Sequence, residues 1–188
     1  GLYSLLAGVT SMLAFSTNAL ASTTQRFLSY HQGKSNIEKQ KDIFANSFYI
    51  QLLLGLLTLV VLLLLTPYLF DGILNVPTER VSAARSTYVI VAIILFITLL
   101  CTPYRAILIS HENIVYITII DVIDGILKVA LAFALFHISY DRLIGYASFL
   151  LYIQLFNLMT IAFYAIKKYE ECSIPSIKRI DKQYIREF

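Results

Sequence analysis

Three ionisable side chains stand inside a long apolar run, TIIDVIDGILKVALAF, which extends from Thr118 to Phe133. Asp121, Asp124 and Lys128 follow one another at helical spacings, so on a helix they share one narrow face. Asp124 and Lys128 also have the i,i+4 spacing and the order that favour an ion pair. Such groups can fix helix packing as a pair, or they can contact a charged substrate or a coupling ion.

If this run crosses a bilayer, its charges lie near the centre. At ~1.5 Å per residue, Asp124 falls ~15 Å from the cytoplasmic end of the run. An unpaired charge at that depth costs at least ~2.5–3.5 kcal/mol, so none of the three is expected to face lipid. Two interpretations stay open. One is a structural pair of Asp124 and Lys128 with Asp121 protonated. The other is the wall of a hydrated cavity, with Asp121 and Asp124 as candidates for binding a coupling proton or sodium ion.

Composition indicates that the run belongs to a membrane protein. Hydrophobic residues make up 58% of the 188 residues and charged residues 14%, against roughly a quarter charged in a soluble domain. Segments such as QLLLGLLTLVVLLLLTPYLF show no polar face. We therefore predict an all-α integral membrane protein in which residues 1–168 form an antiparallel transmembrane bundle of five spans. The predicted spans are 2–24, 45–69, 87–109, 114–137 and 143–166.

Basic residues outside the apolar cores predict the orientation. Lys and Arg divide eleven to three between the two sides, and the richer side is expected to be cytoplasmic. That side includes the loop 26–41 and the tail 167–186, whereas the other side carries Arg80, Arg85 and Arg142. Residues 169–188 are predicted to form a cytoplasmic linker, either as an amphipathic helix on the membrane surface or as a loosely ordered segment.

Local signals mark helix ends and kinks. Gly33 predicts a helix end, and Ser35 with Glu38 has the capping-box spacing that starts the next helix. That helix is therefore expected to begin before its apolar run and to project beyond the bilayer. Pro103 is expected to kink the third span.

Polar side chains also mark stripes on three other spans. The first span carries Asn18, the third carries Arg105 after two threonines at helical spacing, and the fifth carries Gln154 and Asn157. Small and polar residues of this kind bring helices together or bond across them. We predict that the stripes line one concave surface and that the second span lies outside it.

No enzyme motif accompanies the stripes. His111 and Glu112 open HENIV, which lacks the HExxH spacing and falls in a turn expected to be solvated. The sequence shows no Gly-rich phosphate loop and no nucleophile elbow, and Cys101 and Cys172 have no metal or redox spacing. We expect no enzyme, no metal, no cofactor beyond a coupling ion, and two free thiols. The basic segments flank spans, which favours membrane lipids over nucleic acid as partners.

Two segments resemble bacterial polysaccharide flippases. In ALASTTQRFLSYHQGKSNIEKQKDIFANSF the matching residues are Ala19, Leu20, Ser22, Gln25, Arg26, Phe27, Gly33 and Lys34. In TPYRAILISHENIVYITIIDVIDGILKVAL they are Pro103, Tyr104, Arg105, Ala106, His111, Glu112 and Lys128. These segments are similar to Wzx-type lipid-linked oligosaccharide flippases of the multidrug/oligosaccharidyl-lipid/polysaccharide exporter superfamily, and the resemblance covers most of the chain.

The resemblance implies that the five spans are part of an N-terminal six-helix lobe whose partner is the C-terminal lobe of a longer chain. In that family the two lobes enclose a cationic cavity. They flip an undecaprenyl-pyrophosphate-linked oligosaccharide across the bacterial inner membrane by alternating access. The resemblance implies that Arg26, Arg105 and Lys128 are the cationic groups near the phosphate path. The polar stripes add Asn18, Gln154 and Asn157 as candidate cavity-lining, substrate-binding residues. Asp121 and Asp124 depart from a purely cationic lining.

Three other functions stay open. A multidrug or metabolite/cation antiporter of the same superfamily would suit the acidic residues, although the QRF and PYRA segments favour the flippase. A membrane-embedded transferase acting on polyprenyl substrates would need a catalytic cluster on a cytoplasmic loop, where this chain has basic residues and His111-Glu112. A non-catalytic scaffold would leave the intramembrane charges without a role.

Overall fold

The described part of the chain is helical throughout. A computed structural model describes residues 21–70, 81–134 and 142–172. A helical segment at 21–33 is followed by α2 (Ile37–Tyr68), α3 (Val81–Ser110), α4 (Ile114–Ala134), α5 (Arg142–Lys168) and the short 3-10 helix η3 (Glu170–Cys172). The prediction of an all-α fold is confirmed.

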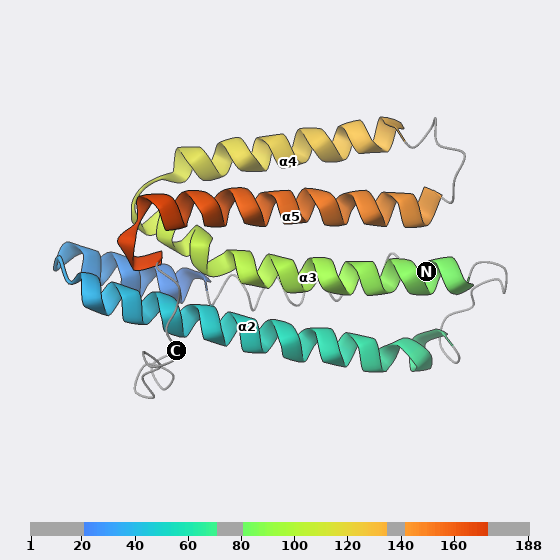
Figure 1. The fold of residues 1–188 in the computed structure, drawn as a ribbon, viewed down its shortest axis with the longest axis horizontal. Helices are drawn as coiled ribbons and strands as arrows, with labels where there is room; N and C mark the ends of the chain where they lie inside the picture. The colour runs from blue at the N-terminus through green and yellow to red at the C-terminus, as the bar shows by residue number, and fades with distance from the viewer. Residues whose placement is uncertain (1–20, 71–80, 135–141, 173–188) are drawn as a thin grey trace.

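The four long helices run side by side along the longest axis of the molecule (Figure 1). Their order across the bundle is α4, α5, α3, α2, so α5 lies between α3 and α4 although it follows both in the sequence. α3 packs on α2 and α5, whereas α4 packs mainly on α5. The turn after the helical segment 21–33, the turn between α3 and α4, and η3 all lie at one end of the bundle, here called the turn end.

Three helices are long and apolar enough to cross a membrane: α2, α3 and the stretch Ile144–Lys168 of α5. The described chain therefore has the character of a multi-pass membrane protein. α4, with 21 residues, is ~31 Å long, which matches the hydrocarbon layer, but it carries three ionisable side chains. The first predicted span falls mainly on residues 1–20 and lies outside the described residues, so the count of five spans stays a prediction.

α5 follows its predicted span of 143–166 closely. α3 ends within one residue of the predicted 87–109, but it begins at Val81, before the apolar run. α2 begins at Ile37, well before the predicted span start at residue 45, so the helix does extend beyond its apolar run. Pro67 and Pro103 both lie inside helices. The linker predicted for 169–188 begins with Tyr169 and η3, both within the compact bundle, and its remainder lies outside the described residues.

The first turn closes by a Schellman arrangement. The helical segment ends at Gly33 as predicted, but the residue in the left-handed region is Ser35, with φ 53°. The backbone N–H of Ser35 donates to Gln32 O at 2.9 Å, and that of Asn36 donates to His31 O at 3.1 Å. These two bonds satisfy carbonyls that the helix end would otherwise leave free.

The predicted capping box of Ser35 with Glu38 is wrong. Asn36 is the N-cap of α2, and its Oδ1 accepts a bond from the Lys39 backbone N–H at 3.1 Å. The cap moves by one position because Ser35 adopts the left-handed conformation that ends the preceding helix.

The turn between α3 and α4 repeats this geometry. Glu112 has φ 58°, its N–H donates to Ile109 O at 2.9 Å, and the Asn113 N–H donates to Leu108 O at 2.8 Å. α4 then begins at Ile114, directly after the asparagine, as α2 begins directly after Asn36. Both turns reverse the chain within three residues, which makes each helix pair antiparallel.

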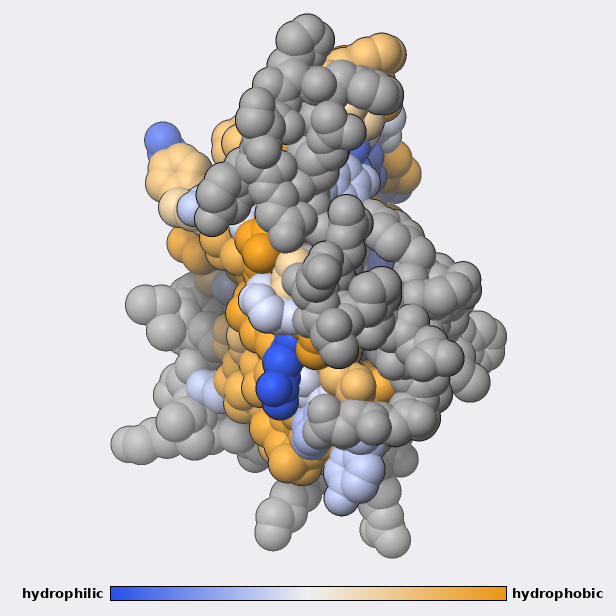
Figure 2. All heavy atoms as spheres, turned by 90° about the vertical axis from the view of Figure 1, so that its right-hand side faces the viewer, coloured by the Kyte–Doolittle hydropathy of each residue, from blue (hydrophilic) through white to orange (hydrophobic). Residues whose placement is uncertain are grey.

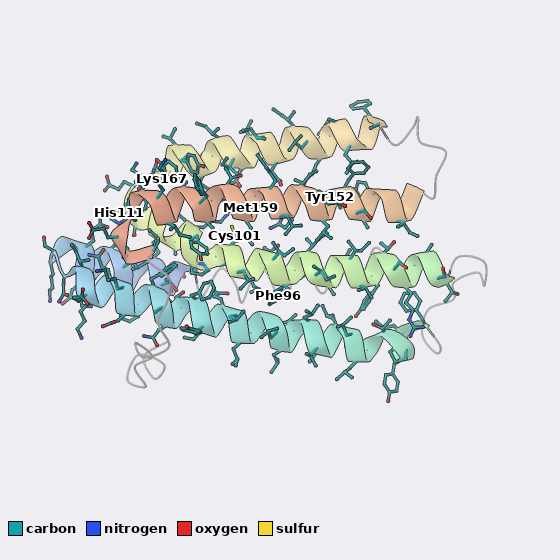
Figure 3. The ribbon with its side chains drawn as sticks, in the orientation of Figure 1. Phe96, Cys101, His111, Tyr152, Met159 and Lys167 are labelled. Atoms are coloured by element: carbon teal, nitrogen blue, oxygen red, sulfur yellow. The ribbon has the colours of Figure 1, made fainter. Side chains whose placement is uncertain are left out.

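Two apolar cores hold the bundle together. The larger lies at the turn end and includes Leu28, Phe44, Ile107 and Ile161. The smaller joins α2 and α3 at the opposite end, around Tyr88 and its neighbours. Between the two cores, Gly55 permits close approach, because a Cβ there would lie 2.9 Å from the Phe96 ring (Figure 3).

Much of the remaining surface is apolar and exposed. Leu53, Leu57, Leu64 and Tyr68 of α2 project outward, and Figure 2 shows orange side chains dominating the described surface at the end opposite the turns. α4 exposes a continuous apolar face from Ile114 to Phe133. Such surfaces suit contact with acyl chains better than contact with water.

Candidate functional site

The strongest ion pair of the site joins two helices. The guanidinium of Arg105, on α3, donates two bonds to the carboxylate of Asp121, on α4: Nη1 to Oδ2 at 3.2 Å and a shorter bond from Nη2 to Oδ1. Arg105 lies two residues after Pro103 on α3. This two-pronged geometry is the strong form of an Arg–carboxylate contact. Both side chains are partly exposed, so the pair is open to a ligand.

The second pair lies deeper on α4. Lys128 Nζ donates to Asp124 Oδ2 at 2.6 Å across one helical turn, as the i,i+4 spacing predicts. The Asp124 side chain is only 17% exposed, and its Oδ1 is buried without a hydrogen-bond partner in the structure. Ile117, Ile120 and Leu131 form the buried stripe of α4, and Asp124 follows the same stripe. Asp124 is therefore a carboxylate within the helix interface.

Neutral polar groups extend this cluster to α5. Cys101 Sγ of α3 lies 3.9 Å from Asn157 Oδ1 of α5, and both residues are buried. Cys101 also lies beside Arg105 on the next turn of α3. Figure 3 shows Cys101 between the two helices. A string of polar groups thus runs from α5 through α3 to α4, and we call the set Cys101, Arg105, Asp121, Asp124, Lys128 and Asn157 the polar cluster.

The depth of the cluster follows from helix rise. Arg105 stands five residues before the end of α3 at Ser110, which is ~7.5 Å, and Asp121 stands ~10 Å from the start of α4. Lys128 lies ~21 Å from that start. If the turn end marks one membrane face, Arg105 is close to the headgroups and Lys128 lies ~6 Å beyond the middle of the hydrocarbon.

The register between α4 and α5 also brings Gln154 to this region. Tyr116 and Tyr164 stack with ring centroids 3.8 Å apart, which fixes the two helices at that level. Counting back along α5 and forward along α4, half-buried Gln154 comes within ~3 Å of the depth of Asp124. Gln154 and Asp124 are thus related by their depth along the bundle.

The remaining predicted site residues are placed differently. Asn18 lies outside the described residues. Arg26 is exposed on the helical segment 21–33 and makes none of the contacts that join the polar cluster. The convergence of all predicted lining residues on one concave surface therefore stays a prediction. Five of the predicted site residues, from three helices, do belong to the polar cluster: Arg105, Asp121, Asp124, Lys128 and Asn157.

A second polar cluster lies at the turn end, where His111 was expected in a solvated turn. The turn is confirmed and Glu112 is exposed, but His111 itself is partly buried. The ring of His111 stacks on Tyr169 with centroids 4.1 Å apart, Nδ1 lies 3.0 Å from Gln32 Nε2, and Nε2 makes a short contact with Glu171 Oε1. Figure 3 shows His111 at this end, beside η3. His111 therefore ties the helical segment 21–33 to η3.

Neighbouring groups reinforce this tie. Asn113 Nδ2 donates to the hydroxyls of Tyr164 at 2.9 Å and Tyr169 at 3.2 Å. Glu171 and Cys172 are buried, and burial raises the pKa of the Cys172 thiol, with the nearby Glu171 charge adding to the shift. Both described cysteines are free thiols, as predicted. No periodic pattern in the sequence predicts these contacts, because they join residues far apart in the chain.

Sequence analysis also missed a set of buried polar side chains on α2, because the second span was predicted to be apolar on all sides. Asn46, Ser47 and Gln51 are buried on one side of α2, and Ser47 Oγ lies 2.9 Å from Thr24 Oγ1 on the helical segment 21–33. The i,i+4 spacing of Ser47 and Gln51 was a helical-face signal, which the leucines that follow obscured.

Within the described ranges, no group of three or more His, Cys, Asp or Glu side chains is arranged to hold a metal ion. The chemistry available to the polar cluster is therefore charge pairing, hydrogen bonding and proton binding. The chain matches no family model, no curated protein and no solved structure.

Proposed function

We propose that this chain is part of a non-catalytic transporter that flips an undecaprenyl-pyrophosphate-linked oligosaccharide across the bacterial inner membrane by alternating access. Its role would lie in polysaccharide or O-antigen biosynthesis, with a C-terminal lobe of the same protein closing the cavity. The proposal combines the resemblance of the QRF and PYRA segments with the position of the polar cluster among apolar helices.

One observation carries the proposal furthest: four charged side chains form two ion pairs on two consecutive helices, α3 and α4, of a largely apolar bundle. Ionisable groups at membrane depth are costly to insert and mark substrate or ion pathways. Arg105 has the planar fork that binds phosphate oxygens in pairs, and it lies at the depth where the pyrophosphate of a lipid-linked glycan would enter. Lys128 offers a second cation ~21 Å from the start of α4.

Glycan export in cells that depend on the full-length protein tests this function. Arg105→Gln and Lys128→Ala should each abolish export while the protein stays in the membrane at normal level. Lys128→Ala also leaves Asp124 without its partner, so part of its effect could come from lost stability.

The double variant Asp124→Asn with Lys128→Gln separates structure from substrate binding. It removes both charges and leaves no buried charge unpaired, so a purely structural pair should tolerate it. If Lys128 contacts the substrate phosphate, export should still fail, because the positive charge itself is needed. Near-normal export at normal protein level would remove Lys128 from the mechanism.

A cation-coupled multidrug or metabolite antiporter is the second candidate, and Asp124 favours it. A carboxylate oxygen that is buried without a partner is suited to hold a proton or a small cation. Energy-dependent efflux of a cationic dye that is lost in Asp124→Asn, in cells whose glycan export is normal, would favour the antiporter over the flippase.

A further inference from the structure

The Arg105 fork is occupied by the protein itself. The Nη1 and Nη2 donors, which together form one edge of the guanidinium, are bonded to the Asp121 carboxylate. One edge of a guanidinium donates to one carboxylate or to one phosphate in this two-pronged manner, and the same edge cannot bind both at once. Any phosphate that binds Arg105 through the same edge must first displace Asp121.

We propose that Asp121 is a built-in competitor for the anionic substrate: phosphate and Asp121 occupy Arg105 by turns, and the displaced Asp121 carboxylate binds a proton. This inference rests on the proposed function and adds a proton-linked release step to it. The step balances because the carboxylate takes one proton from the buffered solution when it leaves Arg105, and returns that proton to the solution when it binds Arg105 again.

The surroundings of Asp121 explain why displacement would favour the protonated form. On α3 it faces Arg105, with Cys101 behind, and on its own helix Asp124 and Lys128 follow one and two turns away. On α5, Asn157 offers a neutral amide, and the phenol of Tyr164 lies two turns nearer the turn end. Once Arg105 binds phosphate and Lys128 holds Asp124, Asp121 has no cation left among these groups and faces a new negative charge.

The architecture makes this pair a suitable switch. α5 lies between α3 and α4, so the two helices contact each other little beyond their shared turn (Figure 1). The Arg105–Asp121 pair is a direct bond between α3 and α4. If phosphate separates Asp121 from Arg105, α4 loses this direct bond to α3, and phosphate binding is then linked to a movement of α4. The Asp124–Lys128 pair lies within a single helix and has no such effect.

The inference can be tested by binding measurements on the full-length protein in phosphatidylcholine nanodiscs. The probe is a polyprenyl diphosphate diester that carries one sugar, because its phosphates have no second ionisation near neutral pH, unlike those of a monoester. Wild-type protein should bind this probe more tightly as the pH falls from about 8 to about 6, by up to roughly tenfold per unit for one linked proton. Binding in weakly buffered solution should take up a proton, measured with a pH dye.

Asp121→Asn should bind the probe roughly tenfold tighter or more at neutral pH, since the charge-assisted bonds that oppose the phosphate are removed. The variant should also bind without proton uptake and with a flat pH dependence. Glu38→Gln is the matched control: it removes an exposed carboxylate paired with Lys41 at the turn end and should leave both properties as in the wild type.

The outcomes are distinct. Binding by the wild type with no proton uptake, and unchanged affinity in Asp121→Asn, would overturn the competition by Asp121 and leave the flippase proposal standing. No probe binding by the wild type or by Asp121→Asn would overturn the flippase proposal. Equal competition by phosphatidylglycerol vesicles would show that Arg105 takes any lipid phosphate. That result would contradict the glycan-lipid assignment while the exchange with Asp121 stood.

Discussion

Each cation of the polar cluster has an acid beside it, so the cluster carries no net charge as a unit. This differs from the cationic lining that the family resemblance implies. Neutral pairing lowers the cost of placing the four groups at membrane depth, because an ion pair with satisfied bonds is far less costly to bury than a lone ion. The same pairing means that a ligand competes with internal partners for every cation of the cluster.

His31, beyond the end of the predicted first span, should make stability depend on pH. Burial lowers the pKa of its imidazole below 6.5, and the nearby Lys39 and Lys34 charges lower it further. The folded protein therefore resists protonation of His31 more than the unfolded chain does. The stability linked to this residue is present above about pH 6.5 and is lost as the pH falls from there through the lowered pKa.

The measurement is the thermal unfolding midpoint in detergent between about pH 7.5 and about pH 5. Wild-type protein should lose more stability over this interval than His31→Gln, which cannot titrate. Parallel profiles for the two proteins would show that His31 contributes no linkage.

At the scale of elements, close approach of α2 and α3 depends on Gly55. Gly55→Leu should destabilise the bundle by about 1–3 kcal/mol, because the new side chain would have to displace the Phe96 ring from a packed interface. Gly125→Leu on α4 is the matched control, since a Cβ there meets nothing within 4 Å. Unfolding midpoints in detergent compare the two, and equal midpoints would show that α2 and α3 do not need a glycine at this contact.

Elements were the part of the fold that the sequence predicted best. Long apolar runs set the positions of α3 and α5, and the i,i+4 rule was enough for the Asp124–Lys128 pair, because both depend only on local spacing. The Arg105–Asp121 pair depends on how the intervening turn aligns two helices, which local spacing does not determine.

The turns themselves show why such alignment was hidden. A left-handed residue normally suggests Gly or Asn, yet Ser35 and Glu112 take this role here, and the asparagine follows in each case. Likewise, His111 and Glu171 come together only after η3 folds back onto the turn end. Pairwise contacts across such distances in the chain leave no periodic pattern in one sequence.

At the scale of the whole molecule, both turns lie at the same end of the bundle, and the basic bias predicts that this end faces the cytoplasm. Cysteines introduced at Ser35 and at Glu112 should therefore resist a membrane-impermeant thiol reagent in intact cells and react after the cells are opened. The free cysteines Cys101 and Cys172 are buried, so their background should be low. The basic bias predicts the reverse behaviour for a cysteine at Thr78, which lies outside the described residues.

Labelling of both positions 35 and 112 in intact cells would invert the predicted orientation. Labelling of only one of the two would contradict the antiparallel hairpins themselves, because α3 and α4 join at the end where the helical segment 21–33 meets α2.

The place of α5 between α3 and α4 has a consequence for biogenesis. The ribosome completes α4 before α5 exists, so the helix with three ionisable side chains must reach the membrane without its main packing partner. Arg105 leaves the ribosome sixteen residues ahead of Asp121, and the tight turn at Glu112 brings the two together within one newly made hairpin. The same holds for Asp124 and Lys128 within a single helical turn. The newly synthesised α3–α4 hairpin can thus enter the bilayer with its charges paired, and α5 packs between the two helices afterwards.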